Sequence, residues 1–166
     1  MSDLPPEKRF AILSDILRAQ HFAWREAVAR EGGDPRAAVE RMWAVTGEQT
    51  ARSYLKRIRV DDPLAPQVAA SIVWSSRAMG EDAHVEPGEG DEAFVRHRAC
   101  PWHDWHARLG LSAEDRPGCD VWFRTTLEAI NRELGTALRR RDARGAAGRW
   151  ALLPAPHLQL AIGARW

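Results

Sequence analysis

The sequence lacks the features that mark several large classes of protein. Its 166 residues include only two cysteines, too few for a scaffold held together by disulfides. The 24 basic and 23 acidic side chains leave a formal charge of +1, without the excess of positive charge that binds nucleic acid. One of the longest stretches without a charged residue, 63–76, is short and contains proline, glutamine and serine, which argues against a membrane span. We therefore expect neither a nucleic-acid nor a membrane partner.

Several catalytic motifs and a targeting signal are missing as well. The chain has no glycine-rich phosphate loop of the Walker or dinucleotide type, no His-Glu-x-x-His and no Gly-x-Ser-x-Gly. Residues 1–7 lack the basic and then apolar order of a secretory signal, which predicts a cytoplasmic protein in a reducing compartment. Cys100 and Cys119 are therefore expected to be free thiols.

Tryptophan is unusually abundant, with eight residues against one tyrosine. Apolar residues make up 45% of the chain, enough for a core, and the length fits one ordinary domain. The tryptophans fit two roles: packing in the core or at its rim, and a flat wall for a planar ligand.

The first half of the chain has the spacing of helices. A helix is predicted from the prolines at 5 and 6 to about Arg30. Its apolar residues are expected to form one buried stripe: Phe10, Leu13, Leu17, Trp24 and Val28. The pairs at 34–35 and 62–63 each join an aspartate that can cap a helix to a proline suited to its first turn, so a second and a third helix are predicted there.

The period changes after Gly80. Segments 84–86 and 94–97 flank a Pro-Gly turn and predict a β-hairpin. A short helix is predicted from Pro101 to Gly110 and a longer one from Asp120 to Gly135, followed by strand-like segments at 137–141, 149–153 and 157–162. We predict one α+β domain over residues 1–166, in which helices in about 7–79 pack on a small antiparallel sheet in about 80–166 that two helices interrupt.

Reactive side chains are densest in residues 97–106, where a predicted strand meets a predicted helix. With a proline in the first helical position, Cys100 becomes the N-cap, where free backbone N–H groups and the helix dipole favour a thiolate, the nucleophilic form. His103 and His106 lie on the same face as Cys100, and either imidazole could serve as a base. Asp104 points elsewhere, so a carboxylate that orients a histidine is expected from another element.

The same residues allow two other interpretations. Cys100, His103 and His106 have a spacing that could close around zinc if Cys119, His97 or His157 completed the ligand set. Alternatively, the protein binds a planar metabolite without catalysis, and the thiols are merely packed. The tryptophans expected to form that pocket are Trp102, Trp105 and Trp122.

Three short motifs carry a family resemblance: Cys100-Pro101-Trp102, Leu109-Gly110-Leu111 and Cys119-Asp120 before an amphipathic helix. Together with the segment from Trp24 to Tyr54, they resemble the L-2-amino-thiazoline-4-carboxylic acid hydrolase-like family. The resemblance implies a hydrolase that opens a small cyclic amidine at its C=N carbon, and Cys100 and Cys119 match the family's two cysteines. Family members commonly end with a further cysteine, whereas this chain has His157 near that place, where its side chain would supply a polar group.

Taken together, the residues and the resemblance predict a hydrolase-like enzyme acting on a C=N or C=O carbon of a small metabolite. In this hypothesis the Cys100 thiolate attacks, His103 or His106 moves the proton, and Cys119 is the second thiol. Trp102, Trp105, Trp122 and His157 are the candidate substrate-binding residues. No cofactor is required, and zinc belongs only to the metal-binding alternative.

Overall fold

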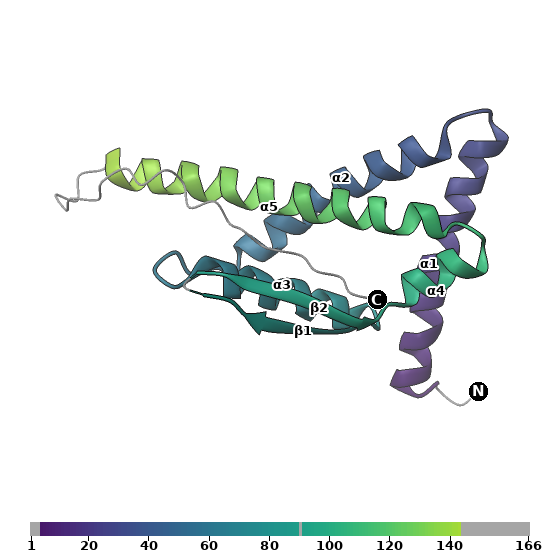
Figure 1. Cartoon of the computed structure of the whole chain (residues 1–166), viewed down its shortest axis with the longest axis horizontal. Helices are drawn as coiled ribbons and strands as arrows, with labels where there is room; N and C mark the ends of the chain where they lie inside the picture. The colour runs from purple at the N-terminus through teal and green to yellow at the C-terminus, as the bar shows by residue number, and fades with distance from the viewer. Residues whose placement is uncertain (1–3, 90, 144–166) are drawn as a thin grey trace.

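The computed structural model describes residues 4–89 and 91–143, with side chains up to Leu134. This part of the chain contains five helices and a two-stranded antiparallel sheet, arranged as in Figure 1, so the predicted α+β class is confirmed. In chain order the elements are α1 (Pro6–Arg30), α2 (Pro35–Leu55), α3 (Leu64–Ala78), β1 (Asp82–Pro87), β2 (Ala93–Ala99), α4 (Pro101–Arg108) and α5 (Ser112–Ala143). None of these helices is both long and apolar enough to cross a membrane.

Local signals determine where the first helices end and begin. α1 ends at Arg30, as predicted, and Gly32 follows with φ +78°, a left-handed conformation that favours glycine. Asp34 then caps α2, because its side chain accepts a hydrogen bond from the backbone N–H of Ala37 at 3.1 Å. Pro35 occupies the first turn, as its fixed φ allows.

Two layers of structure enclose the core. α2 and α5 lie along one another, and α3 packs on the hairpin formed by β1 and β2 (Figure 1). The largest fully buried side chains are Val68, Ile72, Val95, Thr126 and Ile130, contributed by α3, β2 and α5. The apolar face of α3 therefore joins the hairpin to the pair of long helices.

α2 and α5 approach each other closely at Gly47. A Cβ atom at this position would lie 2.9 Å from the carbonyl oxygen of Trp122. The hydroxyl of Thr126 also donates a hydrogen bond to the carbonyl oxygen of Gly47 at 3.3 Å. The absence of a side chain at Gly47 therefore permits this backbone contact.

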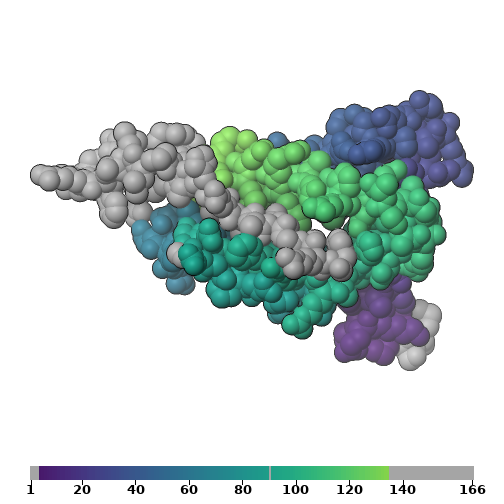
Figure 2. All heavy atoms as spheres, in the orientation of Figure 1, coloured from purple at the N-terminus to yellow at the C-terminus, as the bar shows by residue number. Residues whose placement is uncertain are grey.

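The predicted buried stripe of α1 is wrong. The exposed fractions are 45% for Phe10, 59% for Leu13, 44% for Leu17 and 40% for Trp24. Figure 2 shows the first turns of α1 standing out from the body of the protein. The residues of α1 that are buried are Arg18, His21 and Phe22, because the rest of the chain covers the helix only around them. Helical periodicity identified an amphipathic helix but not what covers it.

The second half of the prediction also needs correction. α5 begins at Ser112, well before Asp120, and Pro117 lies inside it. A proline this near a helix start removes one backbone hydrogen bond without ending the helix. Gly135 does not end α5, and residues 137–141 are helical rather than a strand. The strands predicted at 149–153 and 157–162 lie outside the described residues.

Candidate functional site

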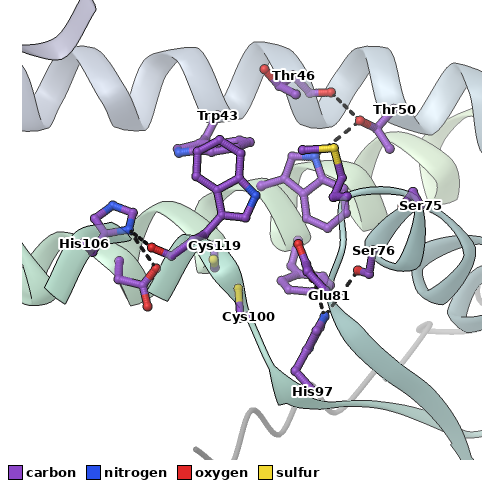
Figure 3. A pocket seen from close by; sticks show the side chains of 15 residues that line it. Trp43, Thr46, Thr50, Ser75, Ser76, Glu81, His97, Cys100, His106 and Cys119 are labelled. Atoms are coloured by element: carbon purple, nitrogen blue, oxygen red, sulfur yellow. Dashed lines mark hydrogen bonds and ion pairs between the residues drawn. The ribbon is translucent and has the colours of Figure 1, made fainter. Parts of the chain in front are cut away.

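A cavity of about 270 Å³ lies between α2, α3, β2, α4 and α5 (Figure 3). The end of α3 and the start of β1 close one side of it with Ser76, Met79 and Glu81. Its volume is near the lower end of the range for small-molecule sites, and its walls are mostly apolar with a few polar groups, as in such sites.

Four aromatic residues, Trp43, Trp102, Trp122 and Phe123, form what we call the aromatic wall of the cavity. The rings hold one another edge to face: the centroids of Trp43 and Trp102 are 5.8 Å apart at 83°, and those of Trp122 and Phe123 are 4.8 Å apart at 70°. The indole N–H of Trp122 also donates to the hydroxyl of Thr50 at 3.3 Å. The wall is therefore fixed by its own contacts.

Two of the three predicted pocket tryptophans, Trp102 and Trp122, line the cavity. Trp105 does not. Its ring stacks on Phe22 of α1, with centroids 5.8 Å apart and planes 4° apart, and the guanidinium of Arg108 lies over it. The structure thus places Trp105 in the contact between α4 and α1, while Trp43, which the sequence did not single out, takes a place in the wall.

Cys100 is the N-cap residue of α4, with Pro101 in the first turn, as predicted. Its thiol lines the cavity but is only 7% exposed. Burial, and then the charge of Glu81, raise the pKa of Cys100 to about 11, against a smaller effect of the backbone N–H groups of His103 and Trp102. The expected lowering of this pKa is therefore wrong, and the thiol is protonated at neutral pH.

Cys119 lines the same cavity from α5, and both cysteines are free thiols, as expected. Figure 3 shows the two sulfur atoms pointing into the cavity close to each other. Burial raises the pKa of Cys119, and the charges of Asp115 and Cys100 add to the effect. Cys119 lies inside α5 and not at a helix start, so no helix terminus offsets its burial.

Asp115 of α5 holds both histidines of α4. Its Oδ2 lies 3.0 Å from Nδ1 of His103, and its Oδ1 lies 3.1 Å from Nδ1 of His106. Burial alone would raise the pKa of Asp115, but the neighbouring imidazoles of His106 and His103 lower it overall. The expectation that an orienting carboxylate comes from another element than α4 is confirmed.

The two histidines are not equivalent. His106 is buried and lines the cavity, whereas the His103 side chain is 41% exposed and does not line it. Nδ1 of His106 lies 2.8 Å from the carbonyl oxygen of Trp102, which can only accept a hydrogen bond, so Nδ1 carries a hydrogen. In the neutral ring of His106 the basic nitrogen is therefore Nε2.

A second polar group lies beside the aromatic wall, where the ring centroids of His97 and Phe123 are 6.5 Å apart. Nε2 of His97 lies 2.9 Å from Oε2 of Glu81 and 3.2 Å from the hydroxyl of Ser76, and all three side chains are largely buried (Figure 3). Sequence reasoning considered His97 only as a metal ligand and missed Glu81 and Ser76. Nothing in the spacing marks them, because α3, the turn after it and β2 bring them together only in the folded chain.

Within residues 4–89 and 91–143, no three His, Cys, Asp or Glu side chains are placed to hold a metal ion, so this part of the chain offers no ligand set for zinc. Nδ1 of His103 and Nδ1 of His106 are directed to Asp115 instead of a common centre with Cys100. His157, which was expected to contribute to a site, lies outside the described residues.

Comparisons of this chain with protein-family models, with curated proteins and with solved structures find no match.

Proposed function

We propose that the protein binds a small, flat and mainly apolar molecule in the cavity. The observation that carries this proposal is the cavity itself, about 270 Å³ in volume and lined by the aromatic wall on one side and by buried polar groups on the other. The cavity is partly open, so water can enter it, and a ligand that covers its apolar wall would release that water. A small molecule with a flat apolar face therefore suits this lining.

Fluorine NMR with para-fluorobenzyl alcohol tests this proposal. The probe has one flat ring and one polar group, and we expect its fluorine signal to broaden and shift when the protein is added. Met79→Trp would fill the cavity, because Met79 lines it, and should abolish the effect. Leu109→Trp is the matched control, since Leu109 is 49% exposed and lies outside the cavity. Unchanged binding to the Met79→Trp protein would contradict the proposal.

A second candidate is thiol-dependent hydrolysis of a bound C=O or C=N compound. One observation favours it: Cys100, Cys119 and His106 all line one cavity. In this reaction the sulfur of Cys100 bonds to the carbon while the thiol proton passes to Nε2 of His106. His106 returns the proton to the leaving nitrogen or oxygen, and water then cleaves the S–C bond and restores the thiol. This is the activity that the family resemblance implies, with His106 in place of the undecided histidine.

The raised pKa of Cys100 makes the base essential to this second candidate. Para-nitrophenyl acetate can acylate a thiol and release nitrophenolate, so intact-mass and peptide analysis would show where an acetyl group attaches. We expect the label on Cys100, its loss in Cys100→Ser, its retention in Cys119→Ser, and slower labelling in His106→Gln. A label on Cys119 alone, or no label on either cysteine, would exclude the reaction.

A further inference from the structure

The carboxylates in the lining of the cavity are Glu81 and Asp115, and among the described residues no lysine or arginine lines it. The guanidinium of Arg18 lies beside the lining, 5.8 Å from the Trp102 ring centroid, and donates to the carbonyl oxygen of Met79. In the described lining, a ligand that carries a carboxylate or phosphate would meet only the imidazoles of His97 and His106, which already face Glu81 and Asp115, so its desolvation would be costly. A positively charged ligand would meet two carboxylates in an environment where charges interact strongly.

Asp115 has an oxygen atom with no hydrogen-bond donor. The side chain is 4% exposed and lines the cavity, and its Oδ2 is held by His103. Oδ1 lies near Nδ1 of His106, but that nitrogen directs its hydrogen to the carbonyl of Trp102, so Oδ1 accepts no hydrogen bond. A buried acceptor without a donor destabilises the fold, and an N–H group of a ligand would satisfy it.

The aromatic wall also favours a cation. The face of an indole or phenyl ring is negative, and a cation within about 6 Å of a ring centroid is attracted to it, most strongly when water is excluded. Three of the four rings in the wall belong to tryptophan, which attracts cations best. Arg18 already lies 5.8 Å from the Trp102 ring centroid, which leaves Trp43 and Trp122 for a ligand. The same rings provide the apolar surface on which the body of a flat ligand can lie.

We propose that the cavity selects a small organic ammonium ion, whose N–H group donates to Oδ1 of Asp115 while its apolar body lies on the aromatic wall. Glu81 contributes its charge from the opposite side of the cavity. This inference rests on the proposed binding function and goes further, because it names the chemical class of the ligand and the residue that recognises its charge.

Three probes with the same ring and different charge separate the two proposals: para-fluorobenzylamine, para-fluorobenzyl alcohol and para-fluorobenzoate at neutral pH. Fluorine NMR titrations give a dissociation constant for each. We expect the amine to bind about tenfold or more tightly than the alcohol, as one charge-assisted hydrogen bond would produce, and the benzoate to bind most weakly.

The outcomes differ for each proposal. Binding of the alcohol as tight as that of the amine, or stronger binding of the benzoate, would overturn the selection of a cation and leave the binding function standing. Failure of all three probes to bind would remove both. The ranking on the unmodified protein decides the question even where a variant does not fold.

The Asp115→Asn variant tests whether Asp115 is the residue that recognises the ammonium group. In this variant we expect the preference for the amine over the alcohol to fall about tenfold while the alcohol binds as before. Asp104→Asn, at an exposed position of α4 that does not line the cavity, is the matched control and should keep the preference. Glu81→Gln provides a second variant, in which a smaller loss is expected. A full preference in both Asp115→Asn and Glu81→Gln would refute the assignment.

Discussion

His21 should make the protein sensitive to mild acid. The side chain is buried at the contact of α1 with the aromatic wall, 5.4 Å from Trp102 and 5.6 Å from Trp43 between ring centroids. Its Nε2 is buried and has no hydrogen-bond partner. Burial, and then the charges of His106 and Arg25, lower the pKa of His21 from 6.5 to about 4, although Glu114 opposes the change.

The sign of the effect follows from the two pKa values. Between about 6.5 and 4 the unfolded chain binds a proton at His21 that the folded chain does not. The free energy of unfolding therefore falls as the pH decreases through this range. The full loss from this group is roughly 3 kcal/mol, of which about 2 kcal/mol should be lost between pH 7 and pH 4.5.

Urea denaturation followed by tryptophan fluorescence at these two pH values measures the loss. In His21→Gln the group no longer titrates, so we expect the loss of unfolding free energy on acidification to shrink by about 2 kcal/mol. His84→Gln is the control, because His84 is a partly exposed histidine on β1 and should leave the loss unchanged. An equal loss in the unmodified protein and in His21→Gln would refute the reasoning.

Two further predictions concern the packing of the helices. Arg25 of α1 makes two hydrogen bonds to Glu114 of α5, at 2.7 and 2.5 Å, and both side chains are mostly buried, so Arg25→Ala should lower the free energy of unfolding by about 1–3 kcal/mol. The double variant with Glu114→Ala should lose less than the sum of the single variants, and additive losses would contradict the pair. Gly47→Ala should also destabilise the protein by about 1–3 kcal/mol in urea denaturation, because the new Cβ would lie 2.9 Å from the Trp122 carbonyl oxygen. A gain in stability, normal for this substitution on an exposed helix face, would show that α2 and α5 separate easily.

The parts of the fold that the sequence predicts are those with local causes. Asp34 with Pro35 and Cys100 with Pro101 begin helices as expected, since capping and proline geometry act within a few residues. The start of α5 is not predicted, because Asp120 has the side chain of an N-cap although it lies inside the helix. The exposed face of α1 is missed because periodicity does not reveal which neighbours cover a helix.

In the candidate site, too, the sequence predicts the residues that have local signals and misses those that other elements supply. Cys100 and His106 can be selected from one short segment, and both line the cavity. Asp115 and Glu81 cannot, because they come from other elements and carry no spacing signal of their own. The predicted thiolate at Cys100 fails for a further reason: burial and the charge of Glu81 outweigh the backbone N–H groups at the helix start, so the pKa of Cys100 is raised to about 11.

Both candidate functions affect the thiol of Cys100, because the negative charge that attracts a cation also disfavours the thiolate. Glu81, and more weakly Asp115, contribute to the raised pKa of Cys100. An ammonium ion bound at Asp115 would offset that charge, so we expect saturating para-fluorobenzylamine to lower the pKa of Cys100 from about 11.

The pH profile of Cys100 alkylation by iodoacetamide, measured in Cys119→Ser, should then shift to lower pH. Steric shielding by the ligand would instead slow alkylation at every pH without moving the midpoint. Para-fluorobenzyl alcohol, which carries no charge, should leave the midpoint unchanged, and an equal shift with the alcohol would show that electrostatics at Asp115 do not control the thiol.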